Sequence, residues 1–401
     1  MNSPRHALLI VEREFLNIHV GVRRVILHYW KFLLANGFEV TIGSPDGNGQ
    51  LVRGFGEIVC ESAVVESVLK PLWESTTRHF KFLEKQSSNE SARIRWTDQL
   101  IKTSGYNVTF VTTPWLCSQR IPLTENIIGV AYDLVPNLLA IGALRLPNFI
   151  DVFSFAAQHD TGFRYFLANA KRVICISQST KSDLVRFYPG LNGRVQVDVP
   201  FELQPSLFTK SETGVPTILM VNAIDHRKNI KTAIEVLIEL RKTLEFRVVI
   251  VGKERMALAE AEAMFNRLSD NHVEVAWHGV VEDSKLHSLY AKSSVLFFPS
   301  IYEGLGLPIL EAQAQGLPVV SSNTSSCGEF NLNKKLCAPP NDVTGFIHLL
   351  KEAIAKPSNI LSGENLRQAT KMAVKSWSNG DRLFAFDADI TGKFNLQSRS
   401  V

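Results

Sequence analysis

The sequence predicts an α/β protein made of two doubly wound domains, each built around a parallel sheet. Short apolar runs alternate with amphipathic stretches of helical length, first from residues 7–11 onward and again from residues 217–221 onward. Between the two series, a stretch that carries several prolines, residues 189–215, is typical of a linker. The same strand–helix order on both sides of one linker therefore favours two similar domains.

Length and composition agree with this organisation. The chain has 401 residues, which suits two or three domains of ordinary size. Its 45% of hydrophobic and 20% of charged residues are typical of a globular protein with an ample core. We expect an N-terminal domain over residues 1–200 and a C-terminal domain over residues 201–375. A last helix over residues 376–401 is expected to return to the first domain.

Charge and hydropathy narrow the classes of function. A net charge of +4 is too small to indicate a nucleic-acid partner. We find neither a signal-peptide core nor an apolar run of the roughly 18–20 residues that cross a bilayer. The five cysteines are widely spread, without the spacing of metal ligands, which favours reduced thiols. We therefore expect a cytoplasmic protein, with the inner face of the membrane as one location.

The first domain begins with a strand over residues 7–11, a helix over 25–34 and a strand over 38–42. In a doubly wound sheet, ligands meet the carboxyl ends of the strands, so Gly21 and Arg24 lie near a ligand. They form either an acceptor or phosphate loop or a plain helix start with solvated arginines. The helix itself either packs its apolar face on the sheet or, being basic and amphipathic, lies on a membrane surface.

The rest of this domain is less regular. Residues 60–105 are polar and are expected to be largely helical, whereas residues 107–111 and 127–131 are expected to be strands. Asp133 follows the second of these strands. It is either a polar site residue that faces the ligand or the cap of a helix or turn.

In the second domain, basic residues stand where a helix begins. The strand over residues 217–221 ends at Asn222, and Arg227 and Lys228 precede a helix over residues 230–244. Two exposed cations at a helix N-terminus oppose the helix dipole by about 0.3–1 kcal/mol each. A diphosphate bound between them and the helix would remove that cost, so we favour a phosphate site over a chance surface pair.

The densest signal is the stretch from Ser300 to Glu311. An apolar strand over residues 295–298 precedes it, and Gly304 and Gly306 allow the backbone to turn and to approach a ligand closely. A helix is expected to begin at Pro308, and its free N–H groups suit an anion. Carboxylates before the turn and in the helix suit sugar hydroxyls. The stretch therefore predicts a site for a sugar attached to a phosphate.

Several other chemistries lack their motifs. There is no GxGxxG after the first strand, no GxxxxGK[ST], no HExxH and no GxSxG. These absences disfavour a dinucleotide-dependent redox enzyme, a P-loop NTPase, a zinc protease and a serine hydrolase. Asp387 and Asp389 stand far from any expected strand end, so we interpret them as a solvated surface rather than as metal ligands.

Residues 217–330 resemble the retaining glycosyltransferases of family 4, which have the GT-B fold of two Rossmann-like domains facing a central cleft. Glu303 and Glu311 reproduce the E-x7-E element of that family. Residues 227–229 are similar to its basic diphosphate element, and residues 278–281 to its loop against the nucleobase. The pattern departs from the family at Tyr132, where many members carry histidine, and at residues 222–223, where many carry Gly-Arg.

The resemblance implies a role for each of these residues. Arg227 and Lys228 would neutralise the leaving diphosphate, Glu303 would hold sugar hydroxyls, and Glu311 would hold the ribose. Asp133 is the expected catalytic residue on the acceptor side. Backbone N–H groups of the Gly-rich turn would contact sugar and phosphate. The other expected substrate-binding residues are Gly304, Leu305, Gly306, Leu307, Asn222, His278, Val281, Gly21 and Arg24.

The same resemblance implies the reaction. We expect a retaining, metal-independent transfer of a hexose or deoxyhexose to a saccharide or lipid-linked saccharide in bacterial surface-polysaccharide synthesis. GDP-mannose and dTDP-rhamnose are the preferred donors, and no cofactor is expected. Peripheral membrane contact and the oligomeric state stay open. The alternatives are a catalytically weak binding or scaffold protein on the same fold, motivated by Tyr132, and a sugar-nucleotide epimerase, which would need no acceptor.

Overall fold

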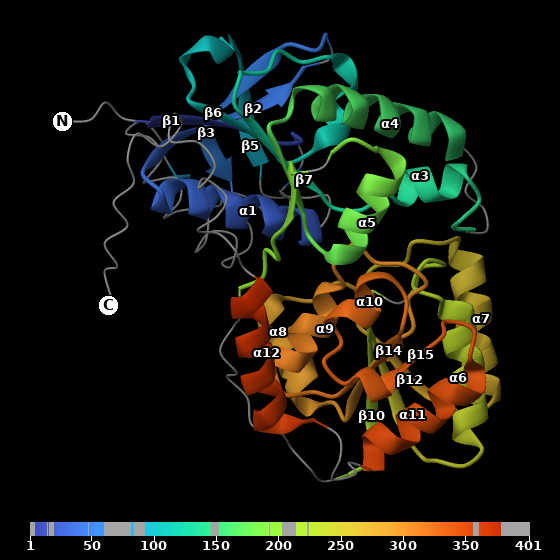
Figure 1. Cartoon of the computed structure of the whole chain (residues 1–401). Helices are drawn as coiled ribbons and strands as arrows, with labels where there is room; N and C mark the ends of the chain where they lie inside the picture. The colour runs from blue at the N-terminus through green and yellow to red at the C-terminus, as the bar shows by residue number, and fades with distance from the viewer. Residues whose placement is uncertain are drawn as a thin grey trace.

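The described residues form two β-sheets, one above the other in Figure 1. The computed structural model describes residues 5–13, 15, 20–46, 48–59, 82–83, 93–145, 152–191, 193–202, 214–222, 224–355 and 361–377. Each sheet is flanked by helices, and the fold is GT-B, as the resemblance implied. None of the helices in this described part is long and apolar enough to cross a bilayer.

The N-terminal sheet has the strand order β4-β3-β2-β1-β6-β7-β8-β9, and β5 pairs with β3. Strands β2, β1 and β6–β9 run parallel, whereas β3 is antiparallel to β2 and β5. The chain moves from β1 outward to β2 and then resumes on the other side of β1 at β6. The order of this sheet therefore reverses between β1 and β6, which is where doubly wound sheets bind ligands. Its strands are β1 (Arg5–Ile10), β2 (Phe38–Pro45), β3 (Leu51–Val59), β4 (Phe82–Leu83), β5 (Arg93–Leu100), β6 (Val108–Val111), β7 (Ile127–Ala131), β8 (Arg172–Cys175) and β9 (Val195–Val197).

Helix α1 (Val20–Ala35) packs its apolar face on this sheet. Val25, Ile26, Tyr29, Trp30 and Leu33 recur at helical spacing, and all are buried. This face is therefore part of the core, and the membrane-surface alternative for the helix is wrong. The other helices among the described residues of this domain are η1 (Thr103–Gly105), η2 (Pro114–Gln119), α3 (Val135–Ala140), α4 (Val152–Asn169) and α5 (Gln178–Phe187).

Two predictions for this domain are corrected. Helix α1 begins at Val20, not at residue 25, so Gly21 and Arg24 lie in its first turns and not in a loop. Residues 93–100 form strand β5, where we expected helix, because their alternation of apolar and polar side chains matches a strand pairing with β3. Residues 60–81 and 84–92 lie outside the described residues.

The C-terminal sheet is entirely parallel, in the order β12-β11-β10-β13-β14-β15. Its order reverses between β10 and β13. The strands are β10 (Thr217–Val221), β11 (Arg247–Val251), β12 (Glu274–Trp277), β13 (Val295–Phe298), β14 (Val319–Ser322) and β15 (Cys337–Ala338). The helices are α6 (Ile230–Arg241), α7 (Leu258–Asp270), α8 (Asp283–Lys292), α9 (Leu307–Ala314), α10 (Ser325–Phe330), η3 (Lys334–Leu336), α11 (Val343–Ala355) and α12 (Gly363–Trp377).

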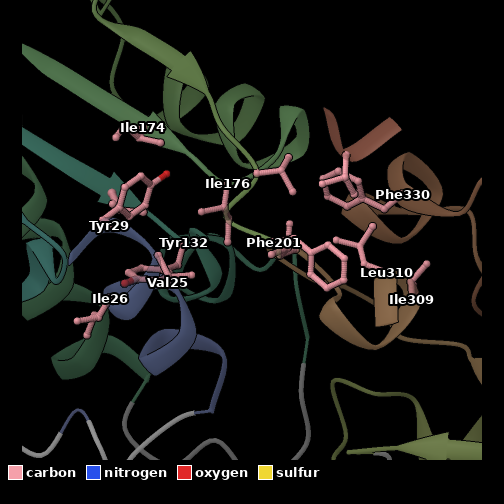
Figure 2. Close-up of a cluster of buried hydrophobic side chains, with 14 of the residues drawn as sticks. Val25, Ile26, Tyr29, Tyr132, Ile174, Ile176, Phe201, Ile309, Leu310 and Phe330 are labelled. Atoms are coloured by element: carbon pink, nitrogen blue, oxygen red, sulfur yellow. The ribbon is translucent and has the colours of Figure 1, made fainter. Parts of the chain in front are cut away.

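One apolar cluster joins the two domains, and we call it the bridging cluster. Figure 2 shows Tyr132 and Ile176 from the N-terminal side and Leu310 and Phe330 from the C-terminal side, with Phe201 between them. All five are buried. The domains therefore meet through continuous packing. Of the helix expected over residues 376–401, only the first two residues, at the end of α12, are described; the rest lies outside the described residues.

Candidate active site

Three charged side chains meet where the order of the C-terminal sheet reverses. Arg227 and Lys228 follow β10, and Glu303 follows β13, the parallel neighbour of β10. Lys228 Nζ donates a hydrogen bond to Glu303 Oε1, and Arg227 Nη1 donates to Glu303 Oε2 at 3.0 Å. Each carboxylate oxygen thus has its own cation, and the trio carries one surplus positive charge, which suits an anion.

Burial sets the electrostatics of this trio. Glu303 is 6% exposed and Lys228 is 9% exposed. Burial alone would raise the pKa of Glu303, but Arg227 and Lys228 outweigh it and hold that pKa at about 2. Burial lowers the pKa of Lys228 despite the nearby carboxylate. The pKa of Arg227 is raised, mainly by Glu303 and to a smaller degree by Asp133. Glu303 is therefore ionised at neutral pH.

Hydroxyl groups after β14 fix the backbone that carries Glu303. Ser325 Oγ accepts a hydrogen bond from Glu303 N at 2.9 Å, and Ser326 Oγ donates to Glu303 O at 2.9 Å. Thr324 Oγ1 donates to Ile301 O at 3.0 Å. Sequence reasoning missed this support, because the hydroxyls and the loop come from different strands.

The Gly-rich turn leads directly into helix α9, as the sequence predicted. Gly306 caps the helix with a φ of 76°, a left-handed conformation that favours glycine, and Pro308 occupies its first turn. A Cβ atom on Gly304 would overlap the carbonyl oxygen of Tyr132 in the other domain. Leu305 is buried in the bridging cluster. The predicted sugar loop is therefore also the place where the two domains touch.

Glu311 and Arg24 are in direct contact, although they come from different domains. Arg24 Nη1 forms an ion pair with Glu311 Oε1, and Arg24 Nη2 lies 3.4 Å from Asp283 Oδ1. Tyr290 donates its hydroxyl to Glu311 Oε2 at 2.7 Å. Both carboxylate oxygens of Glu311, the residue predicted to bind the ribose, therefore already have partners. Tyr290 and Asp283 had not been singled out from the sequence.

Two further predicted residues flank the start of α9. A Cβ atom on Gly21 would lie 3.7 Å from Leu307 Cδ1, in ordinary contact. Gly21 lies in helix α1 and Leu307 is the first residue of α9, so the start of one helix packs beside the start of the other. This contact is between domains, like that of Arg24.

Asp133 lies in the turn before α3 and beside the Glu303 loop. Its Oδ1 accepts a hydrogen bond from Val135 N at 3.1 Å, so it caps the start of α3. A Cβ atom on Gly304 would also lie 3.2 Å from Asp133 Cβ, which places the carboxylate beside the Glu303 loop. Asp133 therefore lies where the two domains meet, and its role as a site residue stays a prediction.

The residues predicted to lie against the nucleobase belong to a second group of loops. His278 N donates to Ile250 O at 3.0 Å, and Gly252 N donates to Gly279 O at 2.6 Å. Asn222, with a φ of 54°, donates from its N to Val251 O at 2.6 Å. These bonds join the ends of β10, β11 and β12. His278 is exposed, whereas Val281 packs against the bridging cluster.

Further contacts between the domains could not be inferred from local sequence. Glu329 accepts hydrogen bonds from the N atoms of Gln178 at 2.9 Å and Ser179 at 3.1 Å, so it caps helix α5 from the other domain. Tyr302 donates its hydroxyl to Asp183 Oδ2 at 2.6 Å. Together with the Arg24–Glu311 pair, these bonds hold the two domains face to face.

Comparison with known proteins covers the part of the chain that contains the charged trio and the Gly-rich turn. Residues 207–376 match the family described as glycosyl transferases group 1. Most of the C-terminal domain is therefore similar to this family. The match covers the strand ends that carry Arg227, Lys228, Glu303 and Glu311, and it agrees with the resemblance stated from the motifs.

The relatives of this chain have low sequence identity to it. O-antigen chain mannosyltransferase B of Escherichia coli is 26% identical over 230 residues, which are 53% of this chain and 59% of that protein. A serotype-specific mannosyltransferase of the same organism is 25% identical over 268 residues, which are 62% of this chain. The match thus spans less than two thirds of the first relative's length and 32% of the second's.

A solved structure matches almost the whole chain. A sucrose-phosphate synthase from Thermosynechococcus elongatus superposes with a TM-score of 0.63 at 16% identity, over 96% of this chain and 100% of that one. At that identity the likeness concerns the fold alone, and it extends over both domains.

Proposed function

We propose that this protein is a glycosyltransferase that moves a hexose or deoxyhexose from a sugar nucleotide to a saccharide or lipid-linked saccharide in surface-polysaccharide synthesis. The observation that carries the proposal is the buried trio of Arg227, Lys228 and Glu303 beside the start of helix α9. Two cations beside a helix start suit a diphosphate, and a fixed carboxylate suits sugar hydroxyls.

The trio also supports a mechanism. Arg227 and Lys228 stabilise the charge that develops on the diphosphate as it leaves, which is the main electrostatic requirement of such a transfer. When the donor binds, Glu303 exchanges part of its cation contacts for sugar hydroxyls. We propose retention by attack on the same face of the sugar, with the leaving phosphate taking the proton of the acceptor hydroxyl. The proposed reaction uses no metal.

The donor is proposed from the relatives. The two Escherichia coli proteins are named as mannosyltransferases, one of them for an O-antigen chain. GDP-mannose is therefore the first donor to test and dTDP-rhamnose the second. We propose a cytoplasmic location, where sugar nucleotides are made.

Two measurements test this function. Thermal-shift titrations with GDP, UDP and dTDP should give a clear stabilisation with one base, because a ligand that binds only the folded state raises its melting temperature. Incubation of the protein with the matching sugar nucleotide and mannosides should then release nucleotide. The rate should be the same with EDTA; loss of activity in EDTA would contradict the metal-free mechanism.

The same assay separates the alternatives. A binding or scaffold protein would show the thermal shift without nucleotide release. An epimerase would convert the donor without an acceptor, which carbohydrate NMR of the donor alone detects. Transfer that depends on acceptor concentration would exclude both.

A further inference from the structure

One serine beside the charged trio has a strained backbone. Ser325, the first residue of α10, has a φ of 46°, a left-handed conformation that crowds the Cβ atom of an L residue. Asparagine and histidine adopt this conformation more readily than serine. They account for three of the other four non-glycine residues with positive φ in the described part of the chain. The conformation at Ser325 therefore disfavours the residue that is present.

Contacts on both sides hold Ser325 in this conformation. Asn323 N donates to Ala338 O of β15 at 2.8 Å, and Thr324 Oγ1 donates to Ile301 O at 3.0 Å. At the other end of α10, Glu329 caps helix α5 of the N-terminal domain. Backbone strain persists where the surrounding structure fixes it, and such strain gathers at functional sites. The chain around Ser325 is thus fixed against β15, the loop after β13 and α5.

The hydroxyl of Ser325 has a defined use in this arrangement. Ser325 Oγ is the acceptor that the described residues offer to Glu303 N, at 2.9 Å. Ser326 Oγ donates to Glu303 O at 2.9 Å, so both backbone polar groups of Glu303 bond to hydroxyls of α10. A glycine at position 325 would suit the backbone better, but it would leave the N–H of Glu303 without this acceptor.

The position of Glu303 decides whether its carboxylate meets both cations. Arg227 Nη1 lies 3.0 Å from Glu303 Oε2, and Lys228 bonds the other oxygen. Hydrogen bonds weaken steeply when their geometry changes. The turn that follows Glu303 contains Gly304 and Gly306, whose backbones have more conformational freedom than those of other residues. The bonds from α10 therefore restrict a loop that its own sequence leaves free to move.

We propose that Ser325 is a positioning residue for Glu303. Its hydroxyl fixes the backbone of Glu303, so that the carboxylate lies ready for the hydroxyls of the donor sugar. The strained conformation is the cost of placing the hydroxyl there. This inference rests on the proposed function, in which Glu303 binds the sugar. Stability and activity then favour different residues at position 325.

Three substitutions separate the hydroxyl from the strain. Ser325→Gly removes both, and Ser325→Ala removes the hydroxyl and keeps the strain. Ser325→Thr keeps the hydroxyl, and its β-branched side chain tolerates a positive φ least. Ser325→Gly should therefore melt above Ser325→Ala, and Ser325→Thr should melt below the natural protein.

Transfer by these variants should follow a different order from stability. With the sugar nucleotide that the natural protein uses, Ser325→Thr should keep kcat within about 3-fold, whereas Ser325→Gly and Ser325→Ala should both lose about 10-fold or more. All three should bind the nucleoside diphosphate alone within about 2-fold of the natural affinity. If Ser325→Thr does not fold, the equal loss of kcat in the other two, at different melting temperatures, still decides.

His272→Gly is the matched control for relief of strain. His272 has a φ of 57°, is exposed and precedes β12, so it lies at the opposite edge of the sheet from the trio. This variant should melt at or above the natural temperature, with kcat unchanged. If Ser325→Gly transfers as fast as the natural protein, or if kcat follows the melting temperature across the Ser325 variants, the proposal is overturned.

A second measurement needs no transfer. Against the effect of burial, Arg227 and Lys228 hold the pKa of Glu303 low. The Cys327 thiol of α10 is also near, and burial raises its pKa, so it stays neutral. A loosened loop weakens the cation contacts, so the melting temperature of Ser325→Gly should fall less steeply than the natural one between pH 5 and pH 3. Curves of equal slope would overturn the positioning role. Lack of transfer by the natural protein would instead count against the proposed function.

Discussion

Arg24 of helix α1 forms an ion pair with Glu311 of helix α9, although 287 residues separate them in the chain. Glu311 is 8% exposed, and its other oxygen is held by Tyr290. If Glu311 binds the ribose of the donor, a ribose hydroxyl must take the place of Arg24. Donor binding and the contact between the two helices then compete for one carboxylate.

The Arg24→Met protein should therefore bind the nucleotide about 3- to 10-fold more tightly. The competing cation is gone, so a ribose hydroxyl can hydrogen-bond to Glu311 without displacing it. The measurement is calorimetric titration with the nucleotide that gives the largest thermal shift. Lys242→Met, which removes an exposed pair with Glu239, is the control and should bind like the natural protein. Weaker binding by Arg24→Met would mean that Arg24 contacts the phosphates.

Lys228→Met should lose most of the transfer activity, by about 100-fold or more in kcat, because one cation no longer stabilises the leaving diphosphate. Nucleotide release assays with saturating donor measure this, and circular dichroism checks the fold. Methionine keeps the volume of the buried stem, and Arg227 still pairs with Glu303. Full activity in a folded Lys228→Met protein would remove the phosphate assignment.

The acid stability of the protein should depend on Glu303. Its pKa is lowered from 4.5 to about 2 in the folded protein, so the stabilisation is complete above pH 4.5 and is lost as the pH falls toward 2. The loss amounts to at most about 3 kcal/mol. Melting temperatures of Glu303→Gln should fall less steeply than those of the natural protein between pH 5 and pH 3. Parallel curves would show that the ion pair contributes nothing there.

His159 should affect the stability of the protein in a different pH range. Burial lowers its pKa from 6.5 to about 4 and outweighs the opposing charges of Asp133 and Asp160. The unfolded chain therefore takes up a proton first, and stability present above pH 6.5 is lost as the pH falls toward 4. The His159→Phe protein keeps a ring that can stack on Phe163. Its melting temperature should change less with pH between pH 7 and pH 4.5 than that of the natural protein. An unchanged slope would show that His159 titrates normally.

The C-terminal domain was the more predictable half, for a physical reason. Strands such as β13 are buried on both faces, so they form unbroken apolar runs that end sharply at the polar loops of the site. Arg227, Lys228 and Glu303 could be grouped because parallel strands bring their carboxyl ends to one edge. The strand β5 was missed because its polar residues conceal a two-residue alternation. The start of α1 was missed because its first turn has no acidic residue to mark it.

The contacts between the domains could not be predicted. No local pattern relates Arg24 to Glu311, or Glu329 to the start of α5, because these pairs depend on how two separately folded sheets dock. The buried hydroxyl of Tyr132, which lacks a partner among the described residues, was equally hidden. From the sequence it was a departure from a family motif, and its burial beside Trp115 depends on the folded structure.

Because of the bridging cluster, the separation of the two domains should depend on temperature. Moving the domains apart exposes buried apolar side chains such as Phe201, Leu310 and Phe330 to water. Exposure of apolar surface raises the heat capacity, and apolar contacts weaken on cooling. The equilibrium between closed and open forms should therefore shift toward the open form in the cold. Small-angle scattering of the ligand-free protein at 5 °C and 30 °C should show the larger radius of gyration at the lower temperature.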